Sequence, residues 1–256
     1  MAFLAGTAVA ITGAGRAEAL ELAGQGAAVV VGDLDESAAR QTVAEISDRG
    51  GAAVASAGDT ATTEAASQVV RANLRGHFVV SRAAIRHWHA VGTGGRIVCT
   101  TSTSGLLGSF GQANYGSAKA GIAAFTQILA QEGWRRGTTA NAISPATRTR
   151  LSDGAYGAVD AEAGFDFWSA DHVAPLVAFL CSAAAAHISG KVFGVQGDVI
   201  ELYQPWRSVA AVENGRVRWS QPALEQQVAR LFDEARVDPA PEDGMRRLRH
   251  SMRKRG

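Results

Sequence analysis

Tyr115 and Lys119 are the two residues of this chain whose types and spacing most directly suggest chemistry. Four positions apart on a helix, they would lie on one face. A free phenol titrates near ~10, and a fixed ammonium beside it favours the phenolate, so the pair could exchange a proton near neutral pH. An exposed helix face without chemistry is the alternative interpretation of an isolated Tyr-x-x-x-Lys pair.

Ser102 is a third candidate, thirteen residues before Tyr115. It follows an apolar run at residues 96–101, which predicts a buried strand, and the small polar residues 103–105 after it predict a loop. In a doubly wound sheet, chemistry collects at the carboxyl ends of parallel strands. The sequence therefore predicts that Ser102 lies at such an end, within reach of a substrate oxygen.

Strand and helix patterns alternate around these residues. Apolar runs predict buried parallel strands at residues 7–12, 27–33, 52–58, 96–101, 139–144 and 191–195. Helical patterns lie at residues 17–24, 36–49, 68–89, 114–133 and 170–185. The alternation predicts an α/β domain with a doubly wound, mostly parallel Rossmann-type sheet.

Four stretches resemble the short-chain dehydrogenase/reductase family: residues 11–16, residues 73–76, the trio Ser102, Tyr115 and Lys119, and residues 141–145. The resemblance covers about residues 3–204, and residues 172–177 and 192–197 are most similar to the (3R)-hydroxyacyl-CoA dehydrogenase branch. It implies an NAD(P)-dependent enzyme that interconverts a secondary alcohol and a ketone. A small hydroxy or keto compound, with CoA-linked 3-hydroxyacyl and 3-oxoacyl thioesters as candidates, is the implied substrate.

The resemblance also implies a role for each catalytic residue. Tyr115 exchanges the proton of the substrate hydroxyl, Ser102 hydrogen-bonds the same oxygen, and Lys119 stabilises the phenolate and contacts the nicotinamide ribose. Asn73 corresponds to the family residue that helps to hold a water in the proton relay beyond Lys119. A plain helix residue is the alternative for Asn73.

Cofactor-binding positions implied by the resemblance are Gly13, Gly15, Arg16, Asp33, Asp59, Tyr115, Lys119 and Pro145. Asp33 ends the second predicted strand, where a carboxylate accepts hydrogen bonds from ribose hydroxyls and repels a 2′-phosphate, which favours NAD over NADP. Asp33 could instead begin a helix cap, and Asp59 could be a turn residue.

Two stretches are shorter than the family pattern. Arg16 runs directly into a helical pattern, so about one turn of the phosphate loop is absent and its cradle of N–H donors is incomplete. Residues 60–72 replace a β–α repeat of roughly 30 residues. We therefore expect the sheet to lack or rearrange one central strand. The alternative function is a catalytically silent, dehydrogenase-like subunit, or an internally deleted product with impaired cofactor binding.

Length and composition agree with one domain over residues 1–204, followed by a helical and basic extension over residues 205–256. The net charge of +1 gives no global reason to expect nucleic acid or an anionic membrane. The basic run at residues 246–255 could bind nucleic acid or CoA phosphates, or be a solvated end. No apolar stretch is long enough to cross a bilayer, so a cytoplasmic location is expected.

The remaining expectations concern sulfur, metal, the substrate lid and assembly. Cys99 and Cys181 should be small buried hydrophobes, and the six histidines lack ligand partners at metal-binding spacing. Residues 151–168 take the place of the substrate lid, where Phe165, Phe167 and Trp168 could line an acyl pocket or pack against the domain. The family resemblance implies a homodimer or homotetramer.

Overall fold

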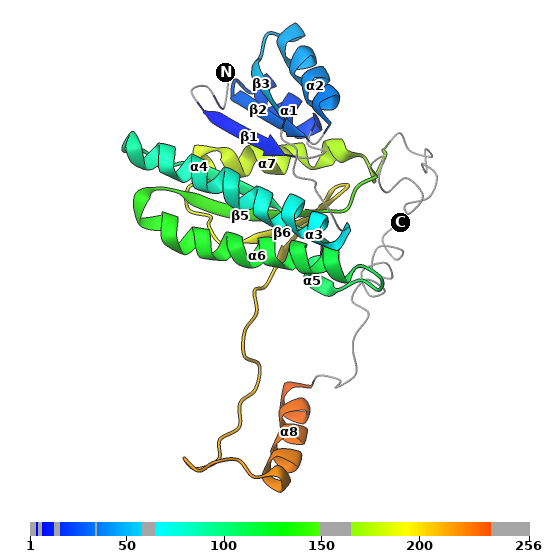
Figure 1. Cartoon of the computed structure of the whole chain (residues 1–256), viewed down its shortest axis with the longest axis vertical. Coiled ribbons are helices and arrows are strands. Elements are labelled where there is room, and N and C mark those ends of the chain that lie inside the picture. The colour runs from blue at the N-terminus through cyan, green and yellow to red at the C-terminus, as the bar shows by residue number, and fades with distance from the viewer. Residues whose placement is uncertain are drawn as a thin grey trace. The chain divides into compact units, whose positions relative to one another are not determined.

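The structure, a computed structural model, describes residues 4, 7–12, 16–33, 35–57, 65–148 and 165–236 of the chain. The chain divides into two compact units, Met1–Tyr203 and Gln204–Gly256 (Figure 1). In the second unit, the described part contains α8 (Gln221–Ala235), which begins where the Ser220 hydroxyl caps the Ala223 N–H. No helix among the described residues is both long and apolar enough to cross a membrane.

The first sheet has three parallel strands, β1 (Ala8–Thr12), β2 (Ala28–Asp33) and β3 (Ala52–Ala57), in that order. Helices α1 (Arg16–Gly24) and α2 (Glu36–Asp48) connect them. Asp35 caps α2 by accepting hydrogen bonds from the Ser37 and Ala38 N–H groups. Because Asp35 provides the cap, the alternative that Asp33 begins it is wrong, and Asp33 is the last residue of β2.

The second sheet has four strands, β4 (Arg96–Thr100), β5 (Thr139–Pro145), β6 (Val192–Gln196) and β7 (Val199–Tyr203). The first three are parallel, and β7 is antiparallel to β6. The sequence patterns missed β7. Gln196 pairs with Val199, so Gly197 and Asp198 form a two-residue hairpin turn, with Gly197 at a φ of 51°.

The two sheets are separate, because β1 pairs only with β2 and β4 pairs only with β5 among the described strands. In one continuous sheet, a further strand would lie between β1 and β4. The expectation that the sheet lacks a central strand is therefore confirmed. The described chain passes from the end of β3 to α3 (Ala65–Val70) with only residues 58–64 between them, which is too short for a strand and its crossover.

The helices follow the predicted order, with three local differences. The predicted helix over residues 68–89 consists of α3, a π-helical turn (Arg71–Arg75) and α4 (Gly76–Ala90). The predicted loop after Ser102 is a short helix, α5 (Thr103–Leu107), which precedes α6 (Ala113–Gly133). The predicted helix over residues 170–185 has a shorter α-helical part, α7 (Ala174–Cys181), between two 3₁₀ turns.

Side-chain packing connects the two sheets. One cluster of buried residues joins Leu22 of α1 and Val29 of β2 to Val177 and Leu180 of α7 and to Ile143 of β5. Figure 1 shows α7 between the β1–β3 layer and the layer that contains β5, β6 and α6. Because α1 packs on α7 and α7 packs on β4, apolar contacts hold the first unit together where a strand is missing.

A second buried cluster lies between α6 and the second sheet, and it includes Cys99, Ile122 and Leu129. Cys99 and Cys181 are both buried free thiols, which confirms their assignment as small hydrophobes. Burial raises the pKa of each thiol to about 11, so neither is reactive near neutral pH.

Candidate active site

Helix α6 places Tyr115 and Lys119 on the same face. The Lys119 Nζ atom lies 5.6 Å from the centroid of the Tyr115 ring. Lys119 is 7% exposed, whereas Tyr115 is half-buried. The cation is thus fixed within the protein next to a phenol that solvent and small molecules can reach.

Two glycines allow α5 to pack directly on α6. A Cβ atom on Gly105 would lie 2.5 Å from the Ala120 nitrogen and 2.7 Å from the Lys119 carbonyl carbon. A Cβ atom on Gly116 would lie 3.0 Å from the Ser104 carbonyl oxygen. Backbone atoms cannot move aside as a flexible side chain can, so only glycine fits at position 105. This contact brings the residues that follow β4 against the turn of α6 that carries Tyr115.

Ser102 connects β4 to α5 and caps that helix. Its Oγ accepts a hydrogen bond from the Ser104 N–H at 3.2 Å. A hydroxyl that accepts one bond still has its own proton to donate. The capping bond fixes the Ser102 side chain and leaves its O–H available for a substrate oxygen.

Lys119 is held by the end of β4. Its Nζ donates to the Thr100 carbonyl at 3.0 Å, and the Thr101 hydroxyl donates to the Lys119 carbonyl at 2.6 Å. Burial lowers the pKa of Lys119 to about 8, and the nearby Cys99 acts in the opposite direction. An ammonium has three N–H donors, so two remain beyond the bond to Thr100.

Asn73 lies in the π-helical turn between α3 and α4. Its Nδ2 donates to the Val69 carbonyl at 2.9 Å, and its own carbonyl lies 2.6 Å from Nδ1 of His77. Nε2 of His77 accepts from the Thr100 N–H at 3.3 Å. The structure therefore connects Asn73 to the end of β4 through His77, which the sequence analysis did not single out. A spacing of four on one helix was the available signal.

His77 and Lys119 together satisfy the open edge of β4 at Thr100. The neighbouring Thr101 N–H donates to the Ile143 carbonyl of β5, and the peptide groups of successive strand residues point to opposite sides. The peptide groups of Thr100 therefore point away from β5, where no described strand pairs with them. Two side chains replace the missing strand at this position.

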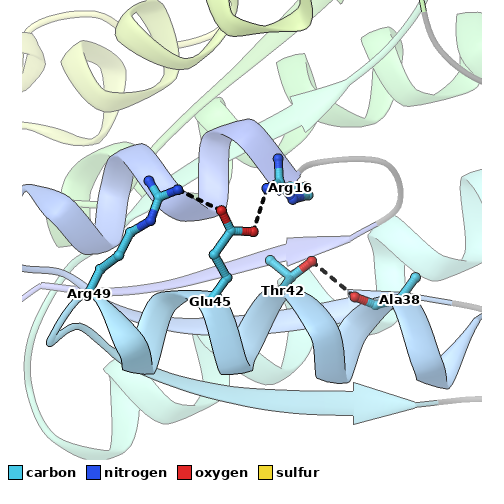
Figure 2. A network of polar contacts seen from close by, with 5 residues as sticks. All are labelled: Arg16, Ala38, Thr42, Glu45 and Arg49. Atoms are coloured by element: carbon cyan, nitrogen blue, oxygen red, sulfur yellow. Dashed lines mark hydrogen bonds and ion pairs between the residues drawn. The ribbon is translucent and has the colours of Figure 1, made fainter.

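Of the residues expected to form the phosphate loop, Arg16 at the start of α1 lies within the described part of the chain. Figure 2 shows Glu45 of α2 between Arg16 and Arg49. The Arg49 Nη2 atom lies 2.6 Å from one carboxylate oxygen of Glu45, and Arg16 pairs with the other. The Arg16 guanidinium is thus already paired with α2. Gly13, Gly15 and Asp59 lie outside the described residues.

Glu18 is an acidic residue in the first turn of α1. Burial raises the pKa of Glu18, with Asp171 adding to the effect, and its Oε2 atom has no hydrogen-bond partner among the described residues. Helix N-termini attract anions, and phosphates bind there in dinucleotide-binding folds. A carboxylate here competes with a phosphate for the same partial positive charge.

A cavity of about 630 Å³ lies against α1 and α2 rather than at Tyr115. Arg16, Leu20, Ile46 and Asp171 are among its lining residues. It is therefore separate from the trio of Ser102, Tyr115 and Lys119. No group of three or more His, Cys, Asp or Glu residues within the described ranges could hold a metal ion.

Pro145 ends β5 and is half-buried, one residue before Ala146, whose N–H donates to the Val195 carbonyl of β6.

Three aromatic residues of the expected substrate lid lie in the described part of the chain. The Phe165 ring lies 4.6 Å from that of His172, and Phe167 contacts Trp168 at 4.9 Å. A Cβ atom on Gly197 would lie 2.3 Å from the Phe167 ring. These contacts favour packing against the domain over lining an acyl pocket. Residues 151–164 lie outside the described part.

Comparisons with known proteins identify the family of the chain. A family model described as enoyl-(acyl carrier protein) reductase matches residues 54–197. Hydroxyacyl-CoA dehydrogenase ChsB1 of Mycobacterium tuberculosis is 38% identical over 256 aligned residues, which cover 79% of this chain and 81% of that protein. A 3-oxoacyl-[acyl-carrier-protein] reductase of Synechocystis is 32% identical over 233 residues, with 73% of this chain and 93% of that protein covered.

A solved structure is also similar. The crystal structure of a short-chain dehydrogenase from Mycobacterium avium matches with a TM-score of 0.78 at 33% identity, covering 93% of this chain and all of that one. The chain belongs to the short-chain dehydrogenase/reductase family, whose members use nicotinamide cofactors.

Proposed function

We propose that this protein is an NAD(P)-dependent oxidoreductase that interconverts 3-hydroxyacyl and 3-oxoacyl thioesters. One observation carries the proposal: Tyr115 and the buried Lys119 share a face of α6, and the glycine contact at position 105 packs the Ser102 end of β4 on that helix. The relatives named hydroxyacyl-CoA dehydrogenase and 3-oxoacyl-[acyl-carrier-protein] reductase support the substrate class.

Each residue of the trio has a chemical role. A bound nicotinamide cofactor would supply the acceptor or donor of the hydride for the substrate carbon. In the oxidative direction, the phenolate of Tyr115 takes the proton of the substrate hydroxyl, while the Ser102 O–H donates to the same oxygen. Lys119 keeps a positive charge beside the phenol, and its two remaining N–H groups would hold the ribose hydroxyls.

The remaining cofactor contacts are also proposals. Asp33 at the end of β2 favours NAD over NADP through the ribose hydroxyls, and Gly13, Gly15 and Arg16 would bind the phosphates. Asn73 takes part in the proton relay beyond Lys119, and the protein works as a homodimer or homotetramer. The Arg16–Glu45 pair and the carboxylate of Glu18 would weaken the phosphate end of the site.

Reduction of acetoacetyl-CoA by the purified full chain with NADH tests the proposal. Tyr115→Phe should lower the rate by about 10²-fold or more, because the proton donor is lost. Tyr203→Phe in β7 is the matched control and should leave the rate within about twofold of the starting protein. Equal rates for the Tyr115→Phe variant and the starting protein would contradict the assignment.

A catalytically silent, dehydrogenase-like subunit is the second candidate. The separate β1–β3 and β4–β7 sheets favour it, because the carboxyl ends of β1 and β4 would normally share one nucleotide crevice. NADH titration followed by fluorescence separates the two candidates. Absence of binding by a chain that melts cooperatively supports the silent subunit, and saturable binding supports the enzyme.

A further inference from the structure

The ring of His77 makes two hydrogen bonds that the proposed function does not use. His77 lies at the start of α4 and is partly buried. Its Nδ1 lies 2.6 Å from the Asn73 carbonyl, and its Nε2 lies 3.3 Å from the Thr100 nitrogen. The ring thereby connects the π-helical turn to the last residue of β4.

These two contacts determine the protonation state of the ring. The Asn73 carbonyl can only accept a hydrogen bond, so Nδ1 carries the hydrogen, and the Thr100 N–H can only donate, so Nε2 is unprotonated. An imidazolium would direct an N–H at another N–H. Burial and the charge of Lys119 lower the pKa of His77, which agrees with a neutral ring.

The carbonyl of the same Thr100 holds Lys119. Nζ donates to it at 3.0 Å, so His77 and Lys119 bind the two peptide groups of one residue. Any shift of Thr100 toward or away from α4 therefore also moves the acceptor of Lys119. The π-helical turn that binds the ring is itself stabilised, because the Asn73 side chain donates a hydrogen bond to the Val69 carbonyl.

We propose that His77 is a positioning residue for Lys119, whose neutral ring fixes Thr100 and keeps bulk water away from the Thr100 side of Nζ. The effect of His77 on catalysis rests on the proposed function, whereas its effect on the position of Lys119 does not. Because Thr100 stays in place, the ammonium stays close to Tyr115. Both ring nitrogens of His77 bind backbone groups, so we expect the residue to act through Thr100 and Lys119.

The other ionisable groups around Lys119 make the expected direction clear. They are His77 from α4, Cys99 from β4 and Tyr115 from the same helix, and no described carboxylate forms an ion pair with Nζ. Removal of the ring therefore removes no counter-charge. It admits water beside the ammonium, which raises the pKa of Lys119 from about 8 toward its ordinary range.

The sequence offers an internal control, because Lys119, Lys191 and Lys254 are its only lysines. Trace labelling of the full chain with acetic anhydride at a series of pH values, read by mass spectrometry, gives a separate titration for each. Lys191 is exposed and lies just before β6, so its profile serves as the reference. This readout requires neither cofactor nor turnover.

Three variants separate a positioning role from packing alone. His77→Ala should shift the Lys119 midpoint upward by about one pH unit or more, because water enters. His77→Gln can place its amide oxygen where Nε2 accepts from Thr100, and should keep the midpoint close to that of the starting protein. His87→Gln changes an exposed histidine of the same helix and should have no effect. The Lys191 profile should be the same in all four proteins.

The inference is overturned if the Lys119 midpoint stays unchanged in a folded His77→Ala variant, or if His77→Gln shifts it as far. Should His77→Ala not fold, nitrogen-15 NMR of histidine in the starting protein decides instead. The His77 signal, assigned by its loss in His77→Gln, should show a neutral ring protonated at Nδ1, and an Nε2–H ring refutes the inference. If His77→Ala shifts the Lys119 midpoint but the starting protein reduces no substrate, the inference about His77 stands and the proposed function is refuted.

Discussion

Gly105 allows a test of whether the packing of α5 on α6 positions Ser102 for catalysis. In Gly105→Ala, the new Cβ atom would lie 2.5 Å from the Ala120 nitrogen and 2.7 Å from the Lys119 carbonyl carbon. Ordinary contacts between such atoms need about 3.5 Å, so α5 must move by roughly 1 Å relative to α6. Ser102 caps α5 and moves with it. Overpacking of this kind costs about 1–3 kcal/mol of stability.

The catalytic effect should be comparable in free energy with the loss of stability. A displacement of roughly 1 Å in a catalytic group can lower the rate by about 10²-fold. Acetoacetyl-CoA reduction and thermal melting of the same preparations measure both quantities. The control is Gly24→Ala at the exposed end of α1, where a Cβ atom meets nothing within 4 Å. A Gly105→Ala variant with unchanged melting and unchanged kcat/KM would refute the close α5–α6 contact.

Two further predictions concern the buried polar groups. Asn141→Ala should lower the free energy of unfolding by about 2–4 kcal/mol in denaturant titrations, because it leaves the Ile188 carbonyl and the Lys191 N–H without the side chain that now pairs with both. The lowered pKa of Lys119 means that the folded chain binds fewer protons than the unfolded chain between about pH 8 and 10.5, so this residue makes stability rise with pH across that interval. The difference in free energy of unfolding between the starting protein and Lys119→Met, measured at pH 7.5 and 10.5, should show this rise; an equal difference at both pH values contradicts it.

Much of the fold was accessible from hydrophobic pattern. The apolar runs predicted the six parallel strands to within two residues at either end, because buried strands have few polar positions that could blur their limits. The lack of a central strand was predicted from chain length, since residues 60–72 cannot contain a strand and a crossover helix, but the resulting division into two separate sheets was not predicted. The hairpin strand β7 was missed because its burial alternates along an edge, although the Gly197–Asp198 turn was visible.

The candidate site was also predicted only in part from the sequence. Tyr115 and Lys119 could be paired from their spacing, because one helix fixes both. Helix α5 was missed since Ser102 and small residues resemble a loop, and only the close backbone contact at Gly105 reveals why they are small. His77 was missed because its spacing of four from Asn73 does not indicate a contact with Thr100, which is 23 positions away.

The apolar cluster between α1 and α7 has a consequence for local opening. No ladder of hydrogen bonds joins the two sheets among the described strands, so Leu22, Val177 and Leu180 provide much of their connection. The stabilisation from burying apolar surface decreases on cooling, whereas the hydrogen bonds between the strands of each sheet do not depend on temperature in the same way. Amide hydrogens of β1 to β3 should therefore exchange with solvent as one group, and earlier than those of β4 to β6, most clearly in the cold.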